Sequence, residues 1–200
     1  MNIFCISTTS NISVDEIKNG PLSGIGNVKI IARYSNDQFQ TAFPLTHVTK
    51  EATADSNAVT IKLQHITACE QIINLNVSGA IVVLDTVNLD VNFARNIESN
   101  RPTDSDICIF SPPNLGLNGV WINNSDWVLI DSYDRNRNNI CNAYYITLAG
   151  AKKLFARRNE ILNSNSTFGD YINNSSHNLA NDRLITYMSF MNTSSKPSRI

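Results

Sequence analysis

Two carboxylates follow the most apolar short segment of the sequence. Residues 80–84 read Ala-Ile-Val-Val-Leu, and Asp85 and Asp90 stand in the segment that comes next. The apolar run is too short for a helix and rich in β-branched residues, so it predicts a buried, central strand. Open α/β sheets bind ligands outside the carboxyl ends of such strands. We therefore expect Asp85 to face the main cleft and bind a ligand or a metal ion, the alternative being that it caps the following turn.

Further residues could take part in chemistry, and each has a structural alternative. His65 lies beside Cys69 and Ile72 on a segment with helical periodicity, and is either a hydrogen-bonded core histidine or a site residue. Asp170 precedes a tyrosine and is either a loop residue or a catalytic base. The pattern predicts solvated or surface positions for the remaining charged candidates, which are His47, Asp131, Asp134, Lys152, Lys153, Arg157, Arg158 and His177.

The composition is that of an ordinary globular chain without bulk charge. Of 200 residues, 42% are hydrophobic and 16% are charged, and the net charge of -1 gives no electrostatic case for binding nucleic acid or an anionic membrane. The four cysteines lie far apart among apolar neighbours, which predicts buried free thiols in a reducing compartment. The sequence shows no basic signal segment and no apolar stretch near ~20 residues, so we expect a cytoplasmic protein without a membrane span.

Apolar runs and their periodicity predict a single α/β domain over residues 1–193, followed by a mobile tail at 194–200. We expect a mostly parallel central sheet flanked by helices. Strands are expected at residues 2–8, 28–32, 80–84, 107–110, 120–122, 127–130 and 143–147. Helices are expected at residues 59–74, 148–162 and 179–191, with an irregular polar stretch before residue 107.

Three blocks of the sequence occur in the order typical of one enzyme family. Residues 63–65 read Leu-Gln-His, and a helix then leads to Gly-Ala-Ile-Val-Val-Leu-Asp at residues 79–85. Residues 142–154 read Asn-Ala-Tyr-Tyr-Ile-Thr-Leu-Ala-Gly-Ala-Lys-Lys-Leu, and residues 168–172 read Phe-Gly-Asp-Tyr-Ile. With these blocks the chain resembles the family 25 glycosyltransferases of lipooligosaccharide synthesis, in which a Ser-His pair opens the helix and the strand ends in Glu-Asp-Asp.

The resemblance implies a GT-A-type fold and transfer of a sugar from a UDP- or CMP-linked donor to an acceptor hydroxyl. It implies donor contacts by His65, Asp85 and Tyr144, and a catalytic or acceptor-binding role for Asp170. A divalent cation such as Mn²⁺ or Mg²⁺ can neutralise the charge on the leaving diphosphate, and Asp85 and Asp90 are its candidate ligands. The family's Glu-Asp-Asp is Leu-Asp-Thr here, which keeps only the middle acid, Asp85.

The altered acidic motif leaves three functions open. The first is a working glycosyltransferase, in which Asp90 completes the metal site or basic residues such as Lys196 or Arg199 replace the metal. The second is a glycosyltransferase-like binding or structural module without catalysis, and the third is an unrelated α/β protein. A glycan is the expected acceptor rather than nucleic acid, because the net charge is close to zero. A hydroxylated DNA base is the alternative acceptor if the source is a virus.

Overall fold

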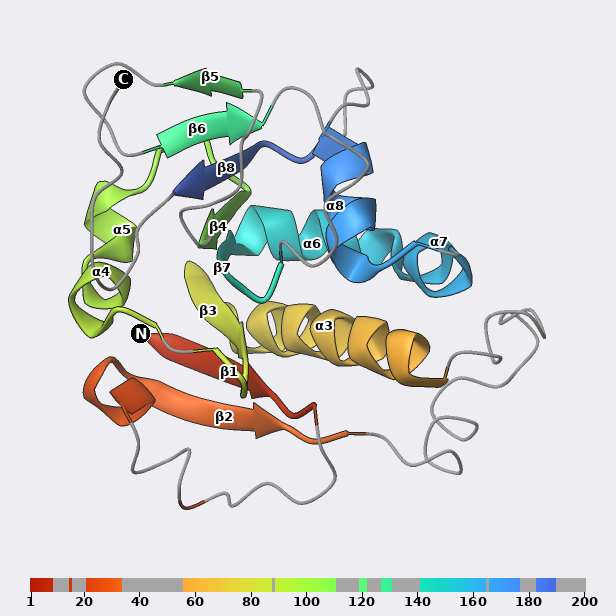
Figure 1. Cartoon of the computed structure of the whole chain (residues 1–200), viewed down its shortest axis with the longest axis horizontal. Helices are drawn as coiled ribbons and strands as arrows, with labels where there is room; N and C mark the ends of the chain where they lie inside the picture. The colour runs from red at the N-terminus through yellow and green to blue at the C-terminus, as the bar shows by residue number, and fades with distance from the viewer. Residues whose placement is uncertain are drawn as a thin grey trace.

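The chain folds around one β-sheet (Figure 1). The computed structural model describes residues 1–8, 15, 21–33, 56–87, 89–110, 119–121, 127–130, 141–164, 166–176 and 183–189. Within these ranges the sheet has eight strands in the order β2-β1-β3-β7-β4-β8-β6-β5. The strands are β1 (Asn2–Ile6), β2 (Asn27–Ile31), β3 (Gly79–Leu84), β4 (Ile107–Phe110), β5 (Gly119–Trp121), β6 (Trp127–Ile130), β7 (Ala143–Thr147) and β8 (Thr186–Ser189).

The strands of this sheet run in both directions. β1 is parallel to β2 and to β3, and β4 is parallel to β8, whereas the other neighbouring pairs are antiparallel. An α/β fold with one central sheet is therefore confirmed, but the sheet is mixed rather than mostly parallel. The five residues of β7 are all buried, so its apolar run resembles that of a parallel strand. An apolar run indicates that both faces of a strand are buried, but it does not determine the direction in which the strand runs.

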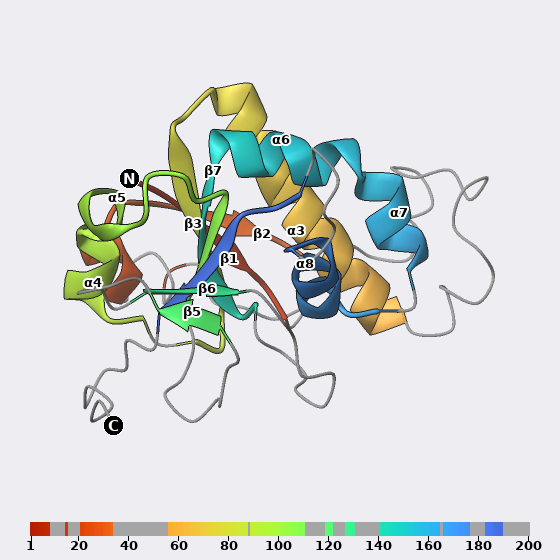
Figure 2. The same ribbon diagram turned by 90° about the horizontal axis from the view of Figure 1, so that it is seen from above.

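Helices cover both faces of the sheet (Figure 2). One face carries α3 (Ser56–Leu75), α6 (Leu148–Ala156), α7 (Arg158–Asn163) and α8 (Phe168–Ser176), and the other carries α4 (Val91–Arg95), α5 (Ile97–Asn100) and the short 3₁₀ helix η1 (Pro21–Gly24). Side chains alternate between two cores along β1, β3, β4 and β7. In β1, Phe4 and Ile6 pack toward the larger group of helices, and Ile3 and Cys5 pack toward the smaller group.

The helix predictions need three corrections. The helix expected at residues 179–191 is wrong, because β8 occupies part of this range and its residues are all buried. The helix expected at 148–162 is two helices, since the N–H of Arg157 bonds to the carbonyls of Leu154 and Phe155 where α6 ends. The polar stretch before residue 107 contains α4 and α5, and α8 forms where the sequence predicts no helix.

Several expectations lie outside the described residues. These are the tail at 194–200 and the residues His47, Asp131, Asp134, His177, Lys196 and Arg199. In the part of the chain that the structure describes, no helix is both long and apolar enough to cross a membrane. The four cysteines are buried and free, as predicted. Burial is the main reason that the pKa rises to about 11 at Cys5 and to about 12 at Cys69 and Cys108.

Candidate functional site

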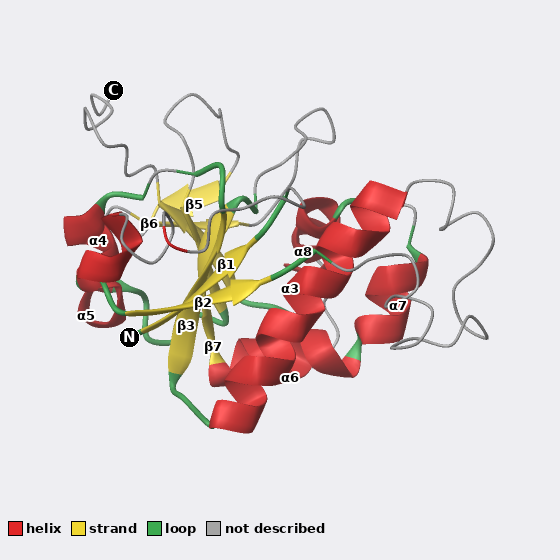
Figure 3. Cartoon of the chain, turned by 90° about the horizontal axis from the view of Figure 1, so that it is seen from below, coloured by secondary structure: helices red, strands yellow, loops and turns green. Residues whose placement is uncertain are grey.

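The carboxyl ends of β1 and β3 mark a topological switch point of the sheet. From β1 the chain proceeds to β2 on one side, and from β3 it proceeds to β4 on the other side. The strand order thus reverses between β1 and β3, which is the place in an open α/β sheet where ligands bind. The described parts of the two connections, η1 and α4, lie on the same face of the sheet, where Arg95 donates to the Gly24 carbonyl at 2.9 Å. Figure 3 shows the strands lying between the α4–α5 pair and the larger group of helices.

Asp85 follows β3 and is held by Thr8, which follows β1. The N–H of Thr8 donates to Asp85 Oδ2 at 3.0 Å, and the Thr8 hydroxyl donates to Oδ1 at 2.7 Å. The N–H of Asp85 donates to the Ile6 carbonyl at 3.0 Å, so the aspartate joins two strand ends across the switch point. The carboxylate is half-buried, and its roughly four lone-pair positions leave capacity for a ligand beside the two Thr8 bonds. The prediction that β3 is a buried interior strand is confirmed.

Asp90 begins α4 as its N-cap. Its Oδ1 accepts hydrogen bonds from the N–H groups of Asn92 at 2.8 Å and Phe93 at 2.9 Å, which are donors that the first turn of a helix leaves unpaired. The structure thus gives Asp90 a local capping role that the sequence analysis missed. Among the described residues, no group of three or more His, Cys, Asp or Glu side chains is arranged to hold a metal ion. A metal site made by Asp85 and Asp90 stays a prediction.

His65 and Tyr144 meet in the core between α3, β7 and α8. His65 Nδ1 lies 2.8 Å from the Tyr144 hydroxyl, and the imidazole stacks on the ring of Phe168 with a centroid distance of 4.0 Å. Burial lowers the pKa of His65 to about 3 and raises the pKa of Tyr144 well above its ordinary value, so both side chains are neutral near pH 7. His65 is 2% exposed and Tyr144 is 0% exposed, so neither presents surface to a ligand in this arrangement. Their predicted contact with a donor stays a prediction.

Asp170 forms a capping box with Thr167 at the start of α8. The N–H and hydroxyl of Thr167 donate to Asp170 Oδ2 at 3.2 and 2.7 Å, and the N–H of Asp170 donates to Thr167 Oγ1 at 3.1 Å. This reciprocal pattern satisfies donors of the first helical turn and fixes the orientation of the carboxylate. The Thr-x-x-Asp spacing in the sequence is the signal that could have predicted α8.

Asp170 and Asp85 lie at the same end of the sheet. The negative charge of Asp170 is the second cause, after burial, that raises the pKa of Cys141, which precedes β7. The next residue, Asn142, accepts a hydrogen bond from the N–H of Leu84 at 2.8 Å, immediately before Asp85. The two carboxylates lie beside different cores, however: Asp170 raises the pKa of Cys141, which packs toward α3 and α8, whereas Asp85, again as the second cause after burial, raises the pKa of Cys5, which packs toward α4 and α5.

Gln64 is a further polar residue at the switch point, and the sequence analysis gave it no role. Its Nε2 donates to the carbonyls of Ser7 and Ile31, both at 2.9 Å, and its side chain is fully buried. These carbonyls lie where β1 and β2 end. A polar side chain among the apolar positions of the helix 59–74 was the available signal, but the sequence cannot show which backbone groups it reaches.

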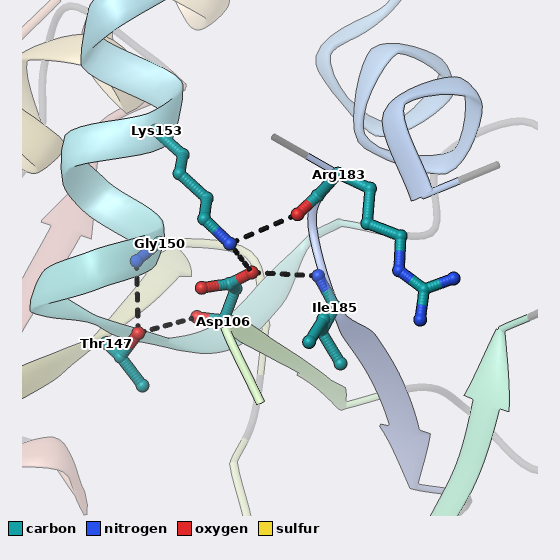
Figure 4. A network of polar contacts seen from close by, with 6 residues as sticks. All are labelled: Asp106, Thr147, Gly150, Lys153, Arg183 and Ile185. Carbon is teal, nitrogen blue, oxygen red and sulfur yellow. Dashed lines mark hydrogen bonds and ion pairs between the residues drawn. The ribbon is translucent and has the colours of Figure 1, made fainter. Parts of the chain in front are cut away.

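A second polar network lies at the other end of the sheet, where β4 and β8 begin (Figure 4). Asp106 Oδ2 accepts from Lys153 Nζ at 2.6 Å and from the N–H of Ile185 at 2.9 Å, and Lys153 Nζ also donates to the Arg183 carbonyl. The Asp106 carbonyl accepts from the N–H of Thr147 at 3.0 Å. Lys153 is therefore a partner of a buried carboxylate rather than part of a solvated face, and this network joins β4, α6 and β8.

No protein-family model matches the sequence, and no curated protein matches it. The arrangement of residues at the switch point is therefore the basis of the functional proposal.

Proposed function

We propose that the protein is a glycosyltransferase that moves a sugar from a nucleotide-sugar donor, such as a UDP-sugar, to an acceptor hydroxyl. The observation that carries the proposal is the Thr8–Asp85 pair at the carboxyl ends of β1 and β3. A half-buried carboxylate with spare acceptor capacity at a switch point suits the hydroxyl groups of such a donor. A GT-A-like architecture, a cytoplasmic location and a glycan acceptor are parts of the same proposal.

Asp170 is the proposed base. In the transfer, the acceptor oxygen bonds to the anomeric carbon, the bond from that carbon to the diphosphate breaks, and the diphosphate keeps the electron pair. The acceptor proton passes to a carboxylate within hydrogen-bond reach. Asp170 supports this role because it is a half-buried carboxylate at the same end of the sheet as Asp85. Its capping box fixes its orientation, as a positioned base requires.

A divalent cation, Mn²⁺ or Mg²⁺, remains part of the proposal. When bound, it would neutralise charge on the leaving diphosphate. Asp85 and Asp90 are the proposed ligands, and each already accepts two hydrogen bonds from the protein. Because Mg²⁺ sheds its water reluctantly and only Asp85 remains of the three acids of the Glu-Asp-Asp motif, we expect donor binding to depend less on metal than in enzymes with three acids.

A glycosyltransferase-like module without catalysis is the second candidate. The burial of His65 and Tyr144 favours it, because two of the residues expected to touch the donor instead pack against each other in the core. The capping box of Asp170 also gives that carboxylate a structural role. In this candidate the switch point still binds a nucleotide sugar, but no transfer follows.

A thermal-shift panel of UDP-, GDP-, CMP- and dTDP-sugars, with and without Mn²⁺, tests the proposal. A ligand that binds the native state raises Tm by mass action. In the arm without Mn²⁺, we expect one donor class to raise the Tm of the wild type and of Asp90→Asn, but not of Asp85→Asn. Asp90→Asn is the matched control, because Asn caps a helix about as well as Asp.

The outcomes of this panel separate the candidates. No shift with any donor, or a shift that survives Asp85→Asn, contradicts the proposed site. A shift in the wild type without release of the nucleoside diphosphate from the same donor supports the module. Loss of a Mn²⁺-dependent shift in Asp90→Asn would show that Asp90 is a metal ligand.

A further inference from the structure

We propose that Gln64 is a positioning residue for the donor site, acting through the peptide bond between Ser7 and Thr8. This inference rests on the proposed function, because it concerns the site to which the nucleotide sugar is assigned. The carbonyl of this peptide is the Ser7 oxygen that accepts from Gln64 Nε2, and its N–H is the Thr8 group that donates to Asp85. One peptide plane is therefore held from both sides where the chain leaves β1.

The same side chain also fixes this peptide relative to β2. Gln64 Nε2 donates to the Ile31 carbonyl, which also accepts from the N–H of Ser7 at 3.1 Å. The two donors of one amide group thus reach the ends of two parallel strands. Rotation of the Ser7–Thr8 peptide would break the bond to Gln64 and would move the Thr8 N–H away from Asp85.

The side-chain oxygen of Gln64, unpaired among the described residues, indicates that the role of this residue lies in the two hydrogen bonds that its Nε2 donates. Oε1 is buried and has no hydrogen-bond partner in the described part of the chain. An unpaired buried acceptor carries a cost in stability, so the amide group is retained for the two hydrogen bonds that it donates. Local rules of this kind are most often broken at functional sites. The two donated bonds, which set the peptide that orients Thr8 and Asp85, are the feature that offsets this cost.

The test compares Gln64→Leu with Gln71→Leu. Gln71 lies two helical turns along α3 and is half-buried, so the control makes the same chemical change on the same helix. Three quantities are measured for each variant: Tm, the affinity for UDP by calorimetry, and the hydrogen-exchange rate of the Thr8 amide. For Gln64→Leu we expect UDP binding to weaken at least tenfold and the Thr8 amide to exchange at least tenfold faster. Gln71→Leu should leave both quantities at the wild-type values.

Gln64→Glu adds a readout that a merely structural role would not give. A protonated carboxyl can donate one hydrogen bond to a carbonyl and an ionised one cannot, and burial raises the pKa of a carboxyl. UDP affinity of this variant should therefore fall, relative to the wild type, as the pH rises through the raised pKa. This variant also decides the matter if Gln64→Leu does not fold.

The outcomes distinguish this inference from the proposed function. If the wild type binds no UDP or UDP-sugar, the assignment of a UDP-linked donor fails. The hydrogen-exchange rate of the Thr8 amide in Gln64→Leu then decides whether Gln64 positions the Ser7–Thr8 peptide. Unchanged Thr8 exchange in Gln64→Leu overturns the inference. Unchanged UDP affinity in Gln64→Leu, or the same pH profile in Gln64→Glu and the wild type, also overturns it.

Discussion

Acidification from pH 7 to pH 5 should destabilise the fold through His65. Burial lowers the pKa of His65 from 6.5 to about 3 in the folded protein. Between these values the unfolded chain binds a proton that the folded chain does not, so the free energy of unfolding falls as the pH falls below 6.5. Each pH unit in this window is worth about 1.4 kcal/mol. Over the 1.5 units between pH 6.5 and 5, the loss is about 2 kcal/mol.

Urea unfolding of the wild type and His65→Gln at pH 5, 6, 7 and 8 measures this loss. Gln does not titrate and keeps a hydrogen-bonding group near the Tyr144 hydroxyl, which lies 2.8 Å from the imidazole. Other titrating groups contribute equally to both proteins, so their effects cancel in the difference. We expect the stability advantage of the wild type to shrink by about 2 kcal/mol between pH 7 and pH 5. Parallel pH profiles would refute the conclusion that His65 is buried in its neutral form.

Three further predictions concern packing, the Asp106 network and the proposed base. Gly150→Ala should lower the free energy of unfolding, measured in urea, by about 1–3 kcal/mol, because the added Cβ would lie 2.5 Å from the Asp106 carbonyl oxygen. Gly24→Ala is the control: nothing lies within 4 Å of its Cβ, so stability should change by less than about 0.5 kcal/mol. Asp106→Asn and Lys153→Met should show a coupling energy of about 1 kcal/mol in a double-mutant cycle. This value is kept low because the lysine side chain is 30% exposed and solvent screens the ion pair. Additive effects of the two substitutions would contradict the ion pair's contribution to stability. Asp170→Asn should lower turnover about 10²- to 10⁴-fold with little change in donor affinity, and wild-type turnover would rule out its role as base.

The strands of this protein could be predicted from sequence because their signal is local. Apolar runs at residues 80–84, 107–110 and 143–147 correspond to β3, β4 and β7 within a residue. The direction of a strand has no such local signal, because a strand buried on both faces reads the same whichever way it runs. The antiparallel position of β7 between β3 and β4 therefore could not be predicted.

Helices were harder to predict where side chains cap them or where tertiary burial overrides periodicity. α4 has five residues, so its short apolar face gives little periodicity, and its start depends on the Asp90 cap. The range 179–191 shows the reverse error. Its spacing of apolar residues fits a helix, but Thr186–Ser189 pair with β4 and β6 and bury every residue.

The candidate site was predictable in its location but not in its contacts. Asp85 follows the most apolar strand, and the rule for open α/β sheets places it at the switch point. Its partner Thr8 is 77 residues away, and Gln64 reaches carbonyls 57 and 33 residues away. Only the folded sheet brings these groups together. His65 illustrates the same limit, since its hydroxyl partner Tyr144 lies 79 residues away.

The position at which a nucleotide sugar binds in solution shows whether the donor site lies at the Thr8–Asp85 pair. The donor that gives the largest thermal shift is titrated into the ¹⁵N-labelled protein, and the amide resonances are followed. We predict that the largest chemical-shift changes occur at Thr8 and Asp85, at the carboxyl ends of β1 and β3. Changes centred instead on Asp106 and Gly150, at the other end of the sheet, or no saturable change at any amide, would contradict it.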